Sequence, residues 1–355
     1  MMRYFIVHTT AKCFVEKYKS SISGGNFSYN LKNAGLFDIT YSILPSNIYD
    51  YTEKLDIDGI NIVYSNIRSK SKVSRILGCL VEQCKLFRII KSNSSVWLYN
   101  ICILNALLFL LLKLFKPTVK INVIVADFTP NEGINSLFLR LINKADGLIT
   151  LSNSNLFHLN NHFILPGIVP IDESYHIVNS PIKRNFLLSG ALNERIASTS
   201  MVMKAFQKLT NLELNITGRG IDADLITEFS NLSDNIKYHG VLSYEEFKTM
   251  LDDNVFVLST RDPHYPENQC NFPSKVLEAL LHNRIIISTI HYPQLEGLLY
   301  FEVPSDYDGF INAINEIAQL SDDKLLQYAN QSEKVKKLFS PSAWQHCIKL
   351  IETNE

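Results

Sequence analysis

The sequence is poor in residues that interrupt or cross-link a chain. It holds 12 prolines, 14 glycines and six cysteines among 355 residues. No two cysteines form a Cys-x-x-Cys pair, and none has histidines at metal-ligand spacing, so the sequence predicts neither a disulfide framework nor a zinc site. This use of cysteine is typical of a reducing cytoplasm.

Signals for export or for crossing a membrane are also lacking. The N-terminus runs directly into a strand-like pattern, without the charged and apolar regions of a signal peptide. The apolar run at residues 101–115 is shorter than the about 20 residues that span a bilayer, and Asn105 and Lys113 interrupt it. We therefore expect a helix buried against a sheet there, and a cytoplasmic protein.

Charge of both signs is present, but it is unevenly distributed. Hydrophobic residues make up 46% of the chain and charged residues 19%, which predicts a globular protein. Residues 1–150 hold 18 Lys and Arg against 10 Asp and Glu, about +8, whereas the remainder holds 16 against 25, about −9. A basic half suits a phosphate-bearing partner or an anionic membrane, and ordinary surface charge explains it equally well.

Strand-like and helix-like runs alternate along the whole chain. At roughly 100–200 residues per domain, the length predicts two domains, at 1–170 and 171–338, with a C-terminal helix at 339–355 that is a candidate for packing back on the first. The alternation predicts an α/β fold of two Rossmann-like, doubly wound domains facing across a cleft. The expected strands are residues 4–8, 60–64, 96–99, 119–126, 147–152, 185–190, 212–218, 255–259 and 285–288.

The segment Cys270-Asn-Phe-Pro-Ser-Lys-Val-Leu-Glu278 carries the strongest chemical signal. Pro273 suits the first turn of a helix, and the free N–H groups near Ser274 and Lys275, together with the helix dipole, favour an anion such as a diphosphate. Glu278 lies one turn further, where a carboxylate accepts hydrogen bonds from a ribose diol. The alternative is a plain capped helix with a surface lysine.

At these residues the sequence resembles the retaining glycosyltransferases of family 4, or group 1, which have the GT-B fold. Phe272, Pro273, Ser274, Lys275 and Glu278 match that family's donor-binding motif, in a Phe-Pro-Ser-Lys form similar to transferases of bacterial surface-polysaccharide assembly. Cys270 stands where the family has a glutamate that contacts the donor sugar. The candidates to replace that contact are Glu267 and Asn271.

Two further segments of the second half resemble the same family. The resemblance implies that Gly190, after a strand, lets the backbone approach the nucleotide, and that Arg195 neutralises charge on the leaving diphosphate. It also implies that Gly218 and Arg219, in a glycine turn, lie near the nucleobase. For Arg195 a surface salt bridge is the alternative.

The first half contributes the remaining candidate residues. The segment that holds Gly24 and Gly25 resembles the family's glycine-containing loop and helix, which approach the diphosphate from the opposite side. Asp127 stands where the wider family often has a histidine, so we expect it to bond a sugar hydroxyl or to orient the acceptor. The alternative for Asp127 is a cap on the turn at residues 129–130.

We expect no metal and no cofactor. The Asp-x-Asp sequence at 56–58 precedes a strand, and the one at 222–224 falls in a helix-like segment. Neither follows a strand, where single-domain transferases commonly hold a cation. The helix terminus and the basic side chains are expected to replace it.

Residues 68–91 form a basic amphipathic pattern. Val73, Leu77 and Val81, with Ile76, Leu80, Cys84 and Phe87, recur at helical spacing among seven Lys and Arg. Such a helix suits contact with an anionic membrane surface, and an ordinary helix packed on the sheet fits the pattern as well.

Taken with the resemblance, these features predict a hexosyltransferase of bacterial O-antigen, lipopolysaccharide or capsule synthesis. It would move a hexose, with retention, from a UDP- or GDP-linked sugar to a glycan acceptor, which we expect to be lipid-linked. Its expected place is the cytoplasm, with the inner face of the membrane as a candidate site for a peripheral enzyme, and nucleic acid is not an expected partner. The alternatives are a nucleotide-sugar 2-epimerase and a catalytically silent partner that binds nucleotide sugar or glycan.

Overall fold

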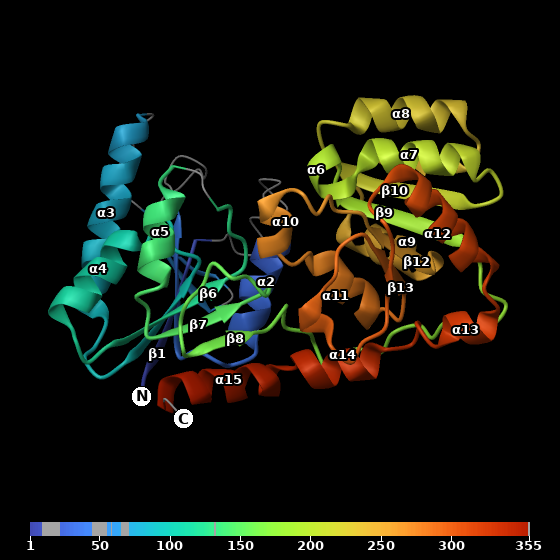
Figure 1. Cartoon of the computed structure of the whole chain (residues 1–355). Coiled ribbons are helices and arrows are strands. Elements are labelled where there is room, and N and C mark those ends of the chain that lie inside the picture. Colours follow the sequence, from blue (N-terminus) through green and yellow to red (C-terminus); the bar gives the residue numbers. More distant parts are fainter. Residues whose placement is uncertain (9–21, 45–54, 58, 65–70, 131–132, 354–355) are drawn as a thin grey trace. The chain divides into compact units, whose positions relative to one another are not determined.

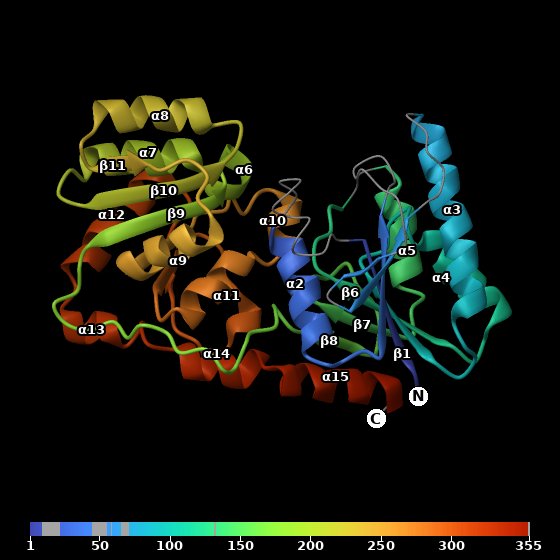
Figure 2. The same ribbon diagram turned by 180° about the vertical axis from the view of Figure 1, so that it is seen from behind.

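The computed structural model describes residues 1–8, 22–44, 55–57, 59–64, 71–130 and 133–353. Two compact units are present (Figures 1 and 2). Unit 1 comprises Met1–Pro170, Cys270–Phe272 and Phe339–Glu355, and unit 2 comprises Ile171–Gln269 and Pro273–Leu338.

Unit 1 is built on an eight-stranded sheet with the order β3-β4-β2-β1-β5-β6-β7-β8. All neighbours pair in parallel except β3 and β4, which are antiparallel. The strands are β1 (Arg3–Val7), β2 (Ile39–Leu44), β3 (Leu55–Ile57), β4 (Ile60–Tyr64), β5 (Ser95–Tyr99), β6 (Lys120–Val125), β7 (Gly147–Thr150) and β8 (His162–Ile164). The predicted strands of this half are confirmed, whereas β2, β3 and β8 were not predicted.

Helices cover both faces of this sheet. On one face, α3 (Lys72–Ile89), α4 (Ala106–Phe115) and α5 (Asn135–Ile142) share a core with Tyr4 and Ile6 of β1. On the other face, α2 (Ile22–Asn33) and α15 (Pro341–Thr353) meet through Phe27 and Trp344, whose ring centroids are 5.7 Å apart.

Only one side of α4 is buried in the core, as predicted for a helix against a sheet. Leu108, Phe109 and Leu112 are buried, whereas Leu114 and Phe115 are exposed. The helix has ten residues. Among the helices of the described residues, none combines the length and hydrophobicity that a membrane span requires.

The C-terminal helix α15 is an integral part of unit 1. The Trp344 indole is fully buried and donates from Nε1 to the carbonyl of Gly167 over 2.8 Å. Glu352 accepts hydrogen bonds from Arg3 Nη2 at 2.7 Å and from Trp97 Nε1 at 3.2 Å. These contacts join residues far apart in the sequence, so the last helix stabilises the first sheet.

Replacing Trp344 with alanine is expected to lower the free energy of unfolding by about 3–5 kcal/mol, because a large buried ring is lost and a cavity remains. Urea unfolding followed by circular dichroism measures this loss. His346→Ala, on the same helix but outside this core, serves as the matched control. An equal effect of the two substitutions would contradict the anchoring role of Trp344.

Unit 2 has a six-stranded, entirely parallel sheet with the order β11-β10-β9-β12-β13-β14. Its strands are β9 (Asn185–Ala191), β10 (Glu213–Arg219), β11 (Ile236–Tyr238), β12 (Phe256–Ser259), β13 (Ile285–Ser288) and β14 (Phe301–Glu302). The helices are α6 (Glu194–Ala197), α7 (Thr199–Lys208), α8 (Ala223–Leu232), α9 (Tyr244–Asp253), α10 (Pro266–Cys270), α11 (Ser274–Leu281), α12 (Tyr307–Gln319), α13 (Asp322–Leu326) and α14 (Ser332–Phe339), with a short 3-10 helix η1 (Pro293–Leu295). The predicted second alternation is confirmed.

Candidate functional site

Because the strands of unit 2 are parallel, their carboxyl ends meet at one edge of the sheet, where open α/β sheets bind ligands. Gly190 lies at the end of β9 and Gly218 at the end of β10, directly opposite each other in the pairing register. β12 leads into Thr260 and Arg261, and α11 begins nearby at Ser274. The sheet topology thus brings together side chains from four separate parts of the sequence.

Lys275, in the first turn of α11, is tied to the end of β9. Its Nζ donates to the carbonyl oxygen of Ser189 over 3.1 Å. Burial, and to a smaller extent the positive charge of Arg261, lowers the pKa of Lys275 to about 7. An anion placed here would favour the charged form of Lys275.

Glu278 lies one turn further along α11. Burial raises the pKa of its carboxyl to about 7, and the charge of Lys248 opposes this shift. Among the residues that the structure describes, no group hydrogen bonds to this carboxylate. Burial, followed by the charge of Glu278, raises the pKa of Tyr244 to about 12, which places the Tyr244 ring near it. Glu278 therefore retains its full capacity to accept hydrogen bonds from a ligand.

The start of α11 differs in one detail from the prediction. Pro273 is the N-cap residue, in an extended conformation with φ −77° and ψ 113°, and is not part of the first turn. No side chain caps the helix, and Ser274 is exposed. The N–H of Val276 donates to the carbonyl of Pro273 over 3.0 Å, so the N–H groups that can face an anion are those of Ser274 and Lys275.

The three residues before Pro273 belong to unit 1. Asn271 Oδ1 accepts from the backbone N–H of Phe128 over 2.7 Å, and the carbonyl of Cys270 accepts from the Ser152 hydroxyl. Phe272 is buried. The amide oxygen of Asn271 is therefore already engaged and is a poor replacement for the family's sugar-binding glutamate.

Arg195, in the short helix α6, makes the salt bridge that was the alternative prediction for it. Its guanidinium pairs with Glu267 and lies 4.8 Å from the Tyr265 ring centroid. About half of the side chain remains exposed, so the group still presents charge to solvent. Glu267, the second candidate for the sugar contact, is engaged by this pair.

Arg261 is a site residue that the sequence did not reveal. It follows β12, and its Nη1 donates to Asn268 Oδ1 over 3.4 Å, while Asn268 Nδ2 donates to the carbonyl of Arg195 over 2.6 Å. The positive charge of Arg261 acts on Lys275 and contributes to lowering the pKa of that lysine. The only sequence signal is an arginine two residues after a strand. That signal indicates a site residue only when the strand order, which places β12 beside β9, is known.

Gly190 and Gly218 differ in what surrounds them. Both have left-handed backbone conformations, with φ of +103° and +133°. A Cβ on Gly190 would have no atom within 4 Å, whereas a Cβ on Gly218 would lie 2.0 Å from the carbonyl oxygen of Gly190. Gly218 is thus required for strand packing, and Gly190 leaves open space at the edge of the sheet. Arg219, which follows Gly218, is exposed.

Alanine at these two glycines should therefore have different effects. We expect Gly218→Ala to lower the free energy of unfolding by several kcal/mol, since the backbone must shift to relieve the overlap. We expect Gly190→Ala to lower it by about 1–2 kcal/mol, because alanine disfavours the left-handed backbone conformation at this position. Thermal unfolding of the two variants tests the difference. Equal midpoints would contradict the packing argument for Gly218.

Unit 1 holds the other predicted residues. Gly24 and Gly25 lie in the first turn of α2 and not in a loop. Of the loop and helix that the resemblance implies, the two glycines belong to the helix. Asp127 is exposed and follows β6. His8, which follows β1, was not predicted, and burial lowers its pKa to about 4, so it is neutral.

Among the described residues, no three His, Cys, Asp or Glu side chains gather as a metal-ligand set.

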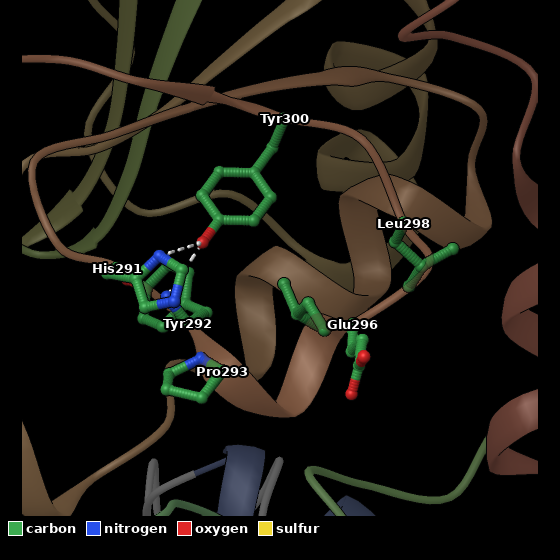
Figure 3. Close-up of a pocket in the computed structure, with 7 residues that line it drawn as sticks. His291, Tyr292, Pro293, Glu296, Leu298 and Tyr300 are labelled. Atoms are coloured by element: carbon green, nitrogen blue, oxygen red, sulfur yellow. Dashed lines mark hydrogen bonds between the residues drawn. The ribbon is translucent and has the colours of Figure 1, made fainter.

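One cavity lies away from the predicted site residues. A cavity of about 360 Å³ lies beside η1, and Tyr300 in its wall accepts a hydrogen bond from the backbone N–H of Tyr292 over 2.7 Å (Figure 3). None of the predicted site residues lines this cavity, but the Tyr292 hydroxyl reaches Ser259 at the end of β12, 2.9 Å away.

Comparisons with known proteins identify the fold. No protein-family model matches the sequence, and no curated protein matches it. The N-terminal domain of trehalose-6-phosphate phosphatase from Candida albicans is similar, with a TM-score of 0.69, 13% identity, and coverage of 99% of this chain and 97% of that one. HepE from Anabaena, in complex with UDP and glucose, has a TM-score of 0.67, 11% identity and full coverage of both chains, 100% each.

A glycosyltransferase from Rickettsia africae is similar as well, with a TM-score of 0.63 at 14% identity, covering 99% of this chain and 97% of that one. At such identities the likeness shows the fold alone. It confirms the predicted GT-B fold class. What the chain does must be argued from its own site.

Proposed function

We propose that the protein is a glycosyltransferase whose donor, a nucleoside-diphosphate sugar, binds at the carboxyl edge of the unit 2 sheet. The observation that carries the proposal is the pair Lys275 and Glu278. They stand one turn apart at the start of α11, and burial moves both pKa values to about 7. Half-buried groups of opposite charge with shifted pKa values, at the carboxyl edge of a parallel sheet, are typical of a functional site.

Each part of a nucleotide sugar finds a chemically suitable group. The diphosphate would be held by the N–H groups at the start of α11 and by protonated Lys275. The carboxylate of Glu278 would accept from the ribose hydroxyls, and the open space at Gly190 allows the nucleotide to approach backbone. Arg195 and Arg261 add positive charge where the leaving diphosphate develops negative charge.

In the proposed reaction, the bond between the anomeric carbon and the diphosphate oxygen breaks while the acceptor oxygen bonds to that carbon. The acceptor proton passes to the departing phosphate oxygen. Stabilisation of the leaving group is then the main contribution of the protein, typically worth a factor of 10²–10³ for each lost donor group. The family resemblance implies attack from the same face, hence retention.

The finer features of the proposal concern the substrates. We take the donor to be a UDP- or GDP-linked hexose, with UDP tested first because HepE, which shares the fold, was solved with UDP-glucose. For the acceptor we propose a lipid-linked glycan of a bacterial polysaccharide, oriented by Asp127. Function without metal stays a prediction.

A transfer assay tests the proposal. Labelled UDP-glucose, UDP-galactose, UDP-N-acetylglucosamine and GDP-mannose would each be incubated with the protein and a bacterial membrane-lipid extract. We expect label to enter the lipid phase from one base class, with release of its diphosphate. Tight donor binding without release would favour the silent partner, and release of a 2-epimer would favour the epimerase.

A further inference from the structure

The outward side of α3 carries an unusual row of apolar side chains. Val73, Leu77 and Val81 follow one another at intervals of four residues and therefore share one face of the helix. Their exposed fractions are 67%, 52% and 48%. The opposite face packs in the core of unit 1 through Leu86 and others. The apolar row thus faces away from the protein.

The neighbouring helix α4 extends this surface. Leu114 and Phe115 are 71% and 67% exposed. The Phe115 ring contacts the Phe87 ring of α3, with centroids 6.3 Å apart. Lys116 Nζ binds the carbonyls of Phe87 and Ile90, which fixes the end of α4 against the end of α3. The two helices appear together on the same face of the sheet (Figure 1).

We name the group Val73, Leu77, Val81, Leu114 and Phe115 the outer apolar face. A shallow depression beside it, of about 520 Å³, is lined by Leu77, Leu80, Val81, Cys84, Lys85 and Arg88. Isolated exposed apolar residues are ordinary, but a row over two helices marks an interaction surface.

The sequence segment that carries the outer apolar face is strongly basic, and of its described basic side chains Lys113 pairs with Asp146 of unit 1 over 2.6 Å. Glu82 is the only acidic residue among residues 68–116, and it is buried and paired with Lys85 over 2.7 Å. The same segment holds nine basic residues: Arg68, Lys70, Lys72, Arg75, Lys85, Arg88, Lys91, Lys113 and Lys116. In the described part of the chain, no acidic side chain pairs with Arg88 or Lys91. Positive charge around apolar side chains is complementary to anionic lipid headgroups above acyl chains.

We propose that the outer apolar face docks on the surface of an anionic lipid bilayer. The apolar tips would enter the headgroup region, and the surrounding cations would contact lipid phosphates. Neither contribution alone gives stable attachment, whereas the two together do. This inference is independent of the donor site, because it concerns only helices of unit 1.

Sedimentation with unilamellar vesicles tests the proposal. One set would be pure phosphatidylcholine, and the other an equal mixture of phosphatidylcholine and phosphatidylglycerol. We expect the protein to sediment with the mixed vesicles at low salt and to be released at high salt, because screening weakens surface charge interactions. Leu77→Glu should weaken the binding about tenfold or more, since it removes an apolar tip and adds a repelled charge.

Two further variants separate the contributions. Arg88→Gln with Lys91→Gln should reduce binding to mixed vesicles by a similar factor of about ten through charge alone. Leu232→Glu, at a leucine on unit 2 that is 68% exposed, is the matched control and should bind as wild type. Circular dichroism and the midpoint of thermal unfolding, which should match those of the wild type, confirm that each variant is folded.

Three results would overturn the proposal: no sedimentation with the mixed vesicles, equal binding to neutral vesicles, or equal effects of Leu77→Glu and Leu232→Glu. A wild-type dimer in analytical ultracentrifugation that Leu77→Glu converts to a monomer would overturn it too, and would assign the outer apolar face to a second copy of the chain.

Discussion

Replacing Lys275 with methionine is expected to lower the rate of sugar transfer about 10²–10³-fold, because the cation nearest the departing diphosphate is lost. The same change should raise the midpoint of thermal unfolding by a few degrees. Burial lowers the pKa of Lys275 from 10.5 to about 7, so the folded protein binds its proton less tightly than the unfolded chain does. The lysine therefore costs stability, most at pH 7 and below, and the cost disappears as the pH rises toward 10.5.

Lys204→Met is the matched control, because Lys204 is an exposed lysine on α7 of the same unit. It should change neither the transfer rate nor the unfolding midpoint. If Lys275→Met instead lowered the midpoint and left transfer intact, Lys275 would be a structural tie between α11 and the carbonyl of Ser189, and its proposed contact with the diphosphate would be wrong.

Glu278→Gln is expected to weaken binding of the nucleotide sugar about 10–100-fold, because charged hydrogen bonds to the ribose are replaced by weaker ones. In the wild type, binding should be strongest near pH 7. Below this pH Glu278 becomes protonated, and above it Lys275 loses its proton, since both pKa values lie at about 7. Glu278→Gln should remove the decline on the acid side only.

Calorimetric titration across pH 5.5 to about 9 measures this profile. A nucleotide sugar serves better than free UDP, because both of its phosphates are substituted and carry no proton near neutrality. Lys275→Met provides the matched comparison, since it should remove the decline on the alkaline side. A wild-type affinity that does not vary with pH would contradict the proposed contacts of both residues.

Stability gives a second, independent readout of Glu278. Its pKa is raised from 4.5 to about 7, so the folded state binds the proton more tightly. Stability therefore falls as the pH rises through this window, and the cost is fully present above pH 7. Glu278→Gln should stabilise the protein at pH 8 and have little effect at pH 4.

Much of the fold was predictable because its signals are local. Strands rich in β-branched side chains, such as β12 and β13, were predicted from composition, but the six-residue strand β2 was missed. The edge strands β3, β8 and β14 have three, three and two residues, too few to give a pattern. Their pairing is decided by the neighbouring strand, which a single sequence does not reveal.

The candidate site also has some residues with a local sequence signal and others without one. The motif around Lys275 and Glu278 is contiguous in the sequence, so it could be proposed from the sequence alone. Arg261 was missed because the strand order β9-β12-β13 brings it near Lys275, and that order cannot be read from a single sequence. The packing role of Gly218 depends on its register with Gly190, and the membership of Cys270 in unit 1 depends on contacts with Ser152. These facts are tertiary and have no local sequence signal.

The most direct test of the central claim, a nucleoside-diphosphate site at the start of α11, is thermal unfolding with UDP, GDP, CDP and dTDP. A diphosphate present at 100 times its dissociation constant stabilises the folded state by about 2.7 kcal/mol, which raises the midpoint measurably. We predict a rise with one base class in the wild type and none in Glu278→Ala. A midpoint unchanged by all four diphosphates would contradict the proposed donor site.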